Sequence, residues 1–279
     1  MVRSQLGRTL AVALACLLAS ACAGSRPPPK PSKGPLTLTY LGVAGWTISD
    51  GSHTLLVDPY FSRTGIRENA HVDEAAIRAR VPPRADLILI GHDHWDHSVD
   101  ARRVAELTGA PLLGGLGLVR RLREQGFPPE RLIGVRGGED FEFSSYSVRV
   151  IPSVHSFTGL ARGGDVDTFA FLFRMNGHEL LVFDTANFVE RELEGLRPDI
   201  VIVATPLREK VHRYTCRLLQ TLGSPAPVLP THIDDFALPP EAPLDQENAA
   251  DLALFVDEVR ACSPGTTVTI PKPFIPVSF

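Results

Sequence analysis

Long apolar runs are absent from this 279-residue sequence beyond its first two dozen residues. Because a membrane-spanning helix needs about 20 consecutive apolar residues, a polytopic membrane protein is excluded. An excess of positive charge is also lacking, since 28 Lys and Arg stand against 32 Asp and Glu. This balance gives no support to nucleic-acid binding as the main task. The composition, 44% hydrophobic and 22% charged, is that of a globular protein.

Cysteine is scarce, with four in the chain. Cys16 and Cys22 belong to the N-terminal segment, so Cys216 and Cys262 are the cysteines of the body. These two lie in separate predicted helices, and spacing alone does not show whether they are close. A disulfide, which an exported compartment permits, and two buried free thiols both remain open.

The N-terminus has the layout of a secretory signal peptide. Arg3 and Arg8 precede an apolar stretch at residues 10–18, and small residues then lead to Cys22. The small-small-Cys ending resembles a bacterial lipobox, in which the cysteine becomes the lipidated first residue. We therefore expect residues 1–21 to be a signal peptide. A non-lipidated signal peptide and a retained anchor are the alternatives.

A proline-rich segment follows at residues 22–35. Proline at this density favours extended polyproline II over a packed core, so the segment is interpreted as a tether. Residues 36–279 would form the functional domain. The predicted protein is an exported lipoprotein anchored through Cys22, on the periplasmic side of the outer membrane.

The body alternates short apolar runs with helical patterns. The runs predict strands at residues 36–41, 46–48, 53–57, 86–90, 146–151, 169–174, 179–183, 200–203, 227–229 and 266–270. Helical periodicity predicts helices at residues 73–80, 99–107, 116–125, 207–222 and 244–260.

Two halves of the body echo one another. Residues 50–58 and 176–184 each read as a turn, an apolar strand and a terminal aspartate. Strands followed by helices, given twice, predict an α/β fold in which two facing sheets carry helices outside.

The segment that follows the buried strand at residues 86–90 carries the strongest chemical signal. It contains His92, His94, Asp96 and His97 within six residues. Imidazole and carboxylate are the ligands that suit borderline divalent metals. Histidines two positions apart point to the same side of an extended chain, so one loop can serve two adjacent metal ions. The alternative, a solvated polar turn, does not explain so dense a spacing.

Three further candidates lie where predicted strands give way to loops. They are His155, Asp184 and His232. Each taken alone is more typical of a structural residue than of a ligand. Together with the histidine-rich loop, their order and placement make them candidate metal ligands.

The pattern H-x-H-x-D-H, then a strand-end histidine, an Asp-Thr pair and a late histidine, resembles the metallo-β-lactamase fold superfamily. Residues 41–46 and 56–61 are similar to the branch that contains L-ascorbate-6-phosphate lactonase and the N-acylphosphatidylethanolamine phospholipase D-like hydrolases. The chain departs from the branch at Val43, where members often carry histidine. The resemblance implies an αββα sandwich of two facing mixed sheets with outer helices.

The resemblance also implies a metal-ligand set at seven positions. One metal would be held by His92, His94 and His155, and the other by Asp96, His97 and His232, with Asp184 bridging both. Two divalent ions are expected, zinc first, with manganese or iron as alternatives.

Chemistry at such a centre is hydrolytic. Two adjacent metals lower the pKa of a shared water, and the resulting hydroxide attacks a carbonyl or phosphoryl centre. Asp96 would also be catalytic, because it can orient the hydroxide and pass a proton to the leaving group. Asp58 is interpreted either as the acceptor that fixes the histidine-rich loop or as a turn aspartate before Pro59.

The sequence thus predicts a dinuclear metal-dependent hydrolase that acts on a small-molecule ester, lactone, amide or phosphodiester. One alternative is a true β-lactamase, which the lack of a cysteine near the ligands disfavours. The other is a non-catalytic metal-binding lipoprotein. No nucleic-acid partner is expected, and the oligomeric state stays open.

The remaining polar residues carry weaker hypotheses. Arg208 and His212 either bind an anionic group or start a solvated helix, and Arg162 is a similar candidate in a glycine-rich loop. His178 is expected to be exposed beside a polar turn, as is His53. Trp95 either forms a pocket wall or packs in the core.

Overall fold

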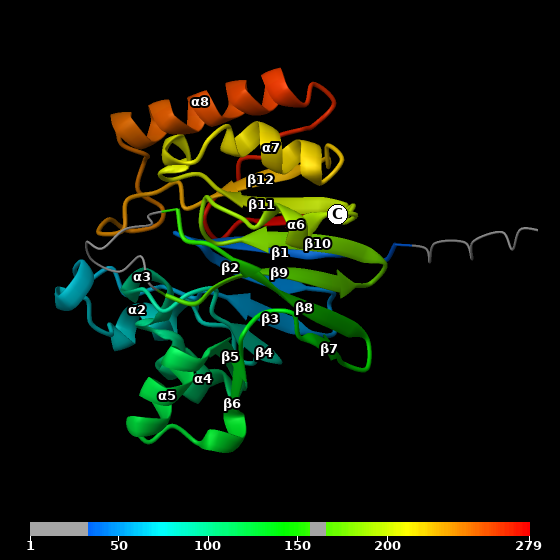
Figure 1. Ribbon diagram of the computed structural model, residues 1–279. Helices are drawn as coiled ribbons and strands as arrows, with labels where there is room; N and C mark the ends of the chain where they lie inside the picture. Colours follow the sequence, from blue (N-terminus) through cyan, green and yellow to red (C-terminus); the bar gives the residue numbers. More distant parts are fainter. Residues whose placement is uncertain (1–32, 157–165) are drawn as a thin grey trace, which may run out of the picture. The chain divides into compact units, whose positions relative to one another are not determined.

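Two mixed β-sheets form the centre of the protein (Figure 1). The structure, a computed structural model, describes residues 33–156 and 166–279. The expected signal peptide, Cys22, most of the tether and Arg162 lie outside the described residues. Residues 33–279 form one unit, and none of its described helices is long and apolar enough to cross a membrane.

The first sheet contains seven strands. In spatial order they are β13 (Pro276–Ser278), β1 (Thr37–Gly42), β2 (Gly45–Ser49), β3 (Thr54–Val57), β4 (Leu87–Leu89), β5 (Leu112–Gly115) and β6 (Leu132–Val135). The pairs from β13 to β3 are antiparallel, and those from β3 to β6 are parallel.

The second sheet contains six strands. In spatial order they are β12 (Val228–Thr231), β11 (Ile200–Ala204), β10 (His178–Phe183), β9 (Thr168–Met175), β8 (Tyr146–Ser153) and β7 (Asp140–Glu142). The pairs among β10, β11 and β12 are parallel, and the others are antiparallel.

The helices cover the outer faces of the two sheets, except α3, which lies at one end of the sandwich (Figure 1). They are α2 (Glu74–Arg80), α3 (Trp95–Ser98), α4 (Ala101–Thr108), α5 (Leu116–Glu124), α6 (Glu190–Leu193), α7 (Tyr214–Thr221) and α8 (Gln246–Cys262), with 3-10 turns η1 (Arg67–Asn69), η2 (Pro129–Arg131) and η3 (Arg208–Lys210).

Three apolar layers hold this arrangement together. Side chains of both sheets, among them Trp46 and Phe171, meet in the central layer. A second layer joins β10–β12 to α7 and α8, and a third joins β3–β5 to α2, α4 and α5. The expected αββα sandwich of two mixed sheets is confirmed.

The echo between the two halves corresponds to two similar hairpins. β2 pairs with β3 and β9 pairs with β10, and an aspartate follows the second strand of each hairpin, Asp58 and Asp184. The β9–β10 turn uses Asn176 and Gly177 with φ of 53° and 82°, the left-handed backbone that a two-residue hairpin favours. Both aspartates are thereby delivered to the same end of the sandwich.

Several element predictions were wrong. The helix expected at residues 207–222 is divided into η3 and α7, because Val211 between them is extended and Arg213 has a left-handed backbone, and helices exclude both. Residues 266–270 form no strand and contribute one bridge, between Val268 and Val228. The strand that completes the first sheet is β13 at the C-terminus. The strands β5, β6 and β7 were not predicted, since they are short and, like the Leu-Leu-Gly-Gly of β5, lack a strong strand pattern.

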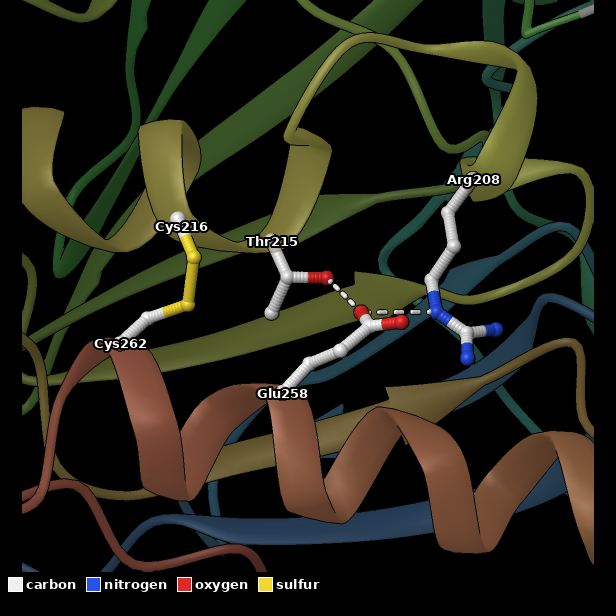
Figure 2. The surroundings of a disulfide bond; sticks show 5 residues. All are labelled: Arg208, Thr215, Cys216, Glu258 and Cys262. Atoms are coloured by element: carbon white, nitrogen blue, oxygen red, sulfur yellow. Dashed lines mark hydrogen bonds and ion pairs between the residues drawn. A yellow bond between two sulfur atoms is a disulfide. The ribbon is translucent and has the colours of Figure 1, made fainter.

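Cys216 of α7 and Cys262 of α8 form a disulfide, with their Cα atoms 5.0 Å apart (Figure 2). This resolves the choice that the sequence left open. Beside it, Glu258 accepts hydrogen bonds from Thr215 at 2.5 Å and from Arg208 at 3.0 Å. The Arg208 side chain is 4% exposed and is committed to Glu258 and Asp251. Both interpretations of Arg208, as an anion-binding group and as a solvated helix start, were therefore wrong.

Candidate metal centre

The histidine-rich loop begins directly after β4 and becomes the single-turn helix α3. His94 caps that turn, and its carbonyl accepts from the backbone N–H of His97 at 3.1 Å and of Ser98 at 2.9 Å. The turn places Asp96 and His97 on the inner side, where both are buried. Asp93 instead pairs with Arg121, so one of the two carboxylates in the segment is not at the centre.

The other candidate residues arrive at the same end of the sandwich from the second sheet. His155 follows β8, Asp184 follows β10 and His232 follows β12. His232 has a left-handed backbone, with φ of 62°, and its N–H donates to the carbonyl of Val43 at 2.6 Å. The turn between β1 and β2 therefore fixes the position of this late histidine.

All seven sequence-predicted residues come together. Their nitrogen and carboxylate oxygen atoms form three overlapping groups, in each of which the atoms lie within 4.8 Å of one another. The groups are His92, His94 and His155; His92, His97 and Asp184; and Asp96, His97 and His232. The first and third correspond to the two expected ligand sets, and the second connects them through Asp184.

The contacts within the cluster are close. His92 Nδ1 lies 2.5 Å from Asp184 Oδ2, and His232 Nε2 lies 3.2 Å from Asp96 Oδ2. The Nε2 atom of His97 lies 3.5 Å from the same oxygen of Asp96. Each carboxylate therefore faces two or more imidazoles, which is the donor set of a borderline divalent metal.

Two buried polar atoms in the cluster have no hydrogen-bond partner among the described residues. They are Asp184 Oδ1 and His232 Nδ1. An unpaired buried acceptor costs free energy, so such atoms call for an explanation. A cation bound to Asp184 supplies the missing partner for its oxygen, and the residues present therefore fit a metal.

Asp58 lies outside the cavity lining and fixes the histidine-rich loop through hydrogen bonds. Its Oδ1 accepts from the N–H of Gly91 at 2.8 Å, and its Oδ2 lies 2.9 Å from His97 Nδ1. A carboxylate on one ring nitrogen leaves the other, Nε2, directed at the centre. The interpretation of Asp58 as the acceptor that fixes the loop is borne out by these contacts.

Gly91 allows the close approach of the two sheets at this point. A Cβ at this position would lie 2.1 Å from Asp184 Oδ2. Any side chain here would displace the carboxylate that connects the two histidine groups.

Burial and the charges of neighbouring groups shift the pKa values in the cluster. Burial raises the pKa of Asp58 to about 6. Burial lowers the pKa of His92, and the neighbouring imidazoles lower it further. Burial also opposes charge on His97, but Asp96 and Asp58 outweigh it and raise the pKa of His97 to about 9. The raised pKa of His97 favours its protonated form at neutral pH when no metal is bound, so metal binding would displace a proton.

The cluster lines a cavity of about 990 Å³. The other lining residues are Ile66, Arg67, Trp95, Ser156, Thr185, Ala186, Pro206, Leu207 and Phe236. Trp95 forms part of the pocket wall, one of its two expected roles. His178, by contrast, is buried beside Gly34, so its predicted exposure was wrong.

Sequence reasoning did not find the cavity residues Ile66, Arg67, Leu207 and Phe236. They come from loops after β3, β11 and β12. No local pattern distinguishes such loop residues from solvated ones, because only the packing of the two sheets brings them to one cavity.

Fold and site together define a class: an αββα sandwich with a histidine and aspartate metal-binding cluster at one end of its sheets. The model of the family described as "Beta-lactamase superfamily domain" matches residues 53–233, which is more than half of the chain. The chain belongs to this superfamily, and the superfamily resemblance is confirmed.

Sequence relatives carry the name "UPF0173 metal-dependent hydrolase". The protein from Pyrobaculum arsenaticum is 26% identical over 216 residues, which cover 75% of this chain and 89% of that protein. The protein from Myxococcus xanthus is 29% identical over 135 residues, 48% of this chain. That match spans 44% of the Myxococcus protein, less than half of its length.

Solved structures share the fold. The metallo hydrolase Igni18 of Ignicoccus hospitalis has a TM-score of 0.62 at 19% identity, over 88% of this chain and 98% of that chain. CmlA, a diiron β-hydroxylase from Streptomyces venezuelae, has a TM-score of 0.61 at 20% identity, over 89% of this chain and 55% of that chain. At these identities the likeness establishes the fold alone.

Proposed function

We propose that this protein is a dinuclear metal-dependent hydrolase that cleaves an ester, lactone, amide or phosphodiester bond in a small molecule. The observation that carries the proposal is the set of three overlapping donor groups, joined through Asp184, whose Oδ1 has no hydrogen-bond partner in the part of the chain that the structure describes. The names of the relatives support hydrolysis as the reaction class.

The residues would divide the metal ions as the sequence indicated. His92, His94 and His155 would hold one ion, Asp96, His97 and His232 the other, and Asp184 would bridge. Divalent ions at these positions, zinc first, would supply Lewis acidity and lower the pKa of a water molecule.

Each protein group has a task in this scheme. Asp96, 3.2 Å from His232, is held so that its carboxylate can orient the water and transfer a proton to the leaving group. Asp58 keeps the His97 ring in one orientation. The apolar walls of the cavity, which include Trp95 and Phe236, would exclude bulk water around the reacting bond once a substrate covers them.

We also propose that the protein belongs to the branch that contains L-ascorbate-6-phosphate lactonase and the N-acylphosphatidylethanolamine phospholipase D-like hydrolases. The support is the similarity of residues 41–46 and 56–61 to that branch. A true β-lactamase with a cysteine metal ligand is not supported, because Cys216 of α7 and Cys262 of α8 form a disulfide with each other. Neither of them is available as a metal ligand.

Export and lipidation at Cys22 remain a proposal. The Cys216–Cys262 disulfide supports an oxidising compartment, since such bonds are rare where thiols are kept reduced. Mass spectrometry of protein from the membrane fraction would test it: a chain that begins at acylated Cys22 is expected. An unmodified Met1 would contradict it.

The function is tested by metal content and hydrolysis together. Elemental mass spectrometry should find about two equivalents of zinc, manganese or iron per chain. A panel of chromogenic esters, lactones and phosphodiesters should then reveal activity that a chelator abolishes and added metal restores. His97→Ala should lose metal and activity, whereas His212→Ala, an exposed histidine outside the cavity, should retain both.

The outcomes separate the alternatives. Two equivalents of metal without hydrolysis of any substrate would favour a non-catalytic metal-binding protein. Less than a tenth of an equivalent after refolding with metal would mean that the cluster is not a metal site.

A further inference from the structure

The cavity carries two kinds of surface besides the metal cluster. One part is apolar and is formed by Ile66, Trp95, Leu207 and Phe236. The other is the guanidinium of Arg67, the only Lys or Arg among the described residues that line the cavity. A ligand that fills this space meets both surfaces.

Apolar side chains at the cavity are exposed to an unusual degree. Ile66 is 51% exposed and Leu207 is 39% exposed, although both are large aliphatic residues. Their exposure is explained if an apolar part of a ligand covers them when the site is occupied. Trp95 and Phe236 extend the same surface, with their ring centres 5.7 Å apart.

Arg67 has no ion pair or hydrogen bond from its side chain to another described residue, unlike most arginines near the site. Arg63 is paired with Asp234, and Arg121 with Asp93. An arginine without an acidic partner beside an apolar surface keeps its planar donor set available for a carboxylate, sulfonate or phosphate.

Two of these residues have an uncommon backbone conformation. Arg67 has φ of 54° and Leu207 has φ of 61°, in the left-handed region that residues with a Cβ seldom adopt. Such conformations cluster at sites where the placement of a side chain matters to function. Here they bring one charged and one apolar group to the same cavity from separate loops.

From the position of Arg67 beside the apolar surface we infer that the cavity selects a small molecule with an apolar body and an anionic group. Arg67 is the residue that binds the anionic group. The inference names a substrate class for the proposed hydrolase. The expected preference for anionic substrates therefore rests on the proposed function. The inference narrows the substrate to an anionic molecule with an apolar part.

Two dyes with the same aromatic skeleton test the inference without catalysis. 1-Anilinonaphthalene-8-sulfonate carries an anion, and N-phenyl-1-naphthylamine does not. The anionic dye should bind the purified protein more tightly, as measured by fluorescence titration. Arg67→Gln should weaken its binding about 5–10-fold and change that of the neutral dye less than two-fold. Arg67→Lys should fall between wild type and Arg67→Gln.

Matched variants separate charge from packing. Arg84→Gln removes an exposed arginine outside the cavity and should change neither dye. Leu207→Ser should weaken both dyes. Equal affinity for the two dyes, or an unchanged affinity of the sulfonate dye in Arg67→Gln, would overturn the role of Arg67. Binding that Leu207→Ser leaves intact would overturn the assignment of the apolar surface.

A kinetic comparison distinguishes this inference from the proposed function. With the metal-loaded protein, kcat/KM for the mono-4-nitrophenyl ester of adipic acid should exceed that for 4-nitrophenyl hexanoate. Arg67→Gln should abolish the preference, because it should lower kcat/KM for the anionic ester far more than for the neutral ester. Dye discrimination without hydrolysis of either ester, or of any other substrate in the panel of esters, lactones and phosphodiesters, would retain the binding inference and refute the hydrolase. Equal hydrolysis of both esters would do the reverse.

Discussion

Replacement of Asp58 by asparagine tests how far the metal centre depends on a residue that does not face the cavity. Asp58 is fully buried and has φ of 42°, a left-handed backbone that asparagine tolerates, so the change removes charge without backbone strain. The carboxylate accepts a hydrogen bond from the N–H of Gly91 at 2.8 Å, and its other oxygen lies 2.9 Å from His97 Nδ1. An amide has one acceptor oxygen, so it can serve one of these donors well but not both.

The expected loss follows from that missing contact. Removal of a carboxylate partner of a metal-bound histidine costs about 10–100-fold in metal affinity, or roughly 1.4–2.7 kcal/mol. Competition with a zinc chelator at constant pH measures it. Activity at saturating zinc should be recovered in large part, because the direct ligands are intact.

Asp100→Asn is the matched control. Asp100 is equally buried and accepts from the N–H groups of Phe61 and Ser62, away from the histidines. This variant should bind zinc like the wild type, whatever its stability. Zinc affinity within two-fold of wild type in Asp58→Asn would refute the argument that Asp58 positions His97.

Three further predictions concern the same molecule. Gly91→Ala should lose metal and activity, since its Cβ would lie 2.1 Å from Asp184 Oδ2; wild-type metal content would contradict this. Replacing Cys216 and Cys262 by alanine should lower the free energy of unfolding by about 4 kcal/mol in urea titrations, from the entropy of a 46-residue loop, and leave zinc affinity unchanged. Zinc binding should release a proton and strengthen as pH rises from 6.5 to 9, because the raised pKa of His97, about 9, keeps it protonated in the metal-free protein. Calorimetry in buffers of different ionisation enthalpy measures that release, and a pH-independent affinity would rule it out.

The residues of the histidine and aspartate cluster were predicted from the sequence more accurately than the bounds of the helices. The spacing of His92, His94, Asp96 and His97 after an apolar strand is local information, and the local backbone preserves it as a loop and one turn of helix. The helix expected at residues 207–222 was wrong because the extended Val211 and the left-handed Arg213 interrupt an otherwise helical pattern. Backbone conformations of that kind depend on tertiary contacts, which periodicity does not encode.

What the sequence by itself determined is the αββα sandwich, through the order of its apolar strands and helices, and the candidate ligands at the strand ends. Only the tertiary structure decided which residues distant in the chain meet. It joined Cys216 to Cys262, turned Asp93 away from the centre and brought Arg67 and Leu207 into one cavity. The physical reason is that strand and helix patterns record burial, which is local. Contacts between loops, by contrast, depend on the packing of the two sheets, which brings together residues as distant in the chain as Arg67 and Leu207, 140 positions apart.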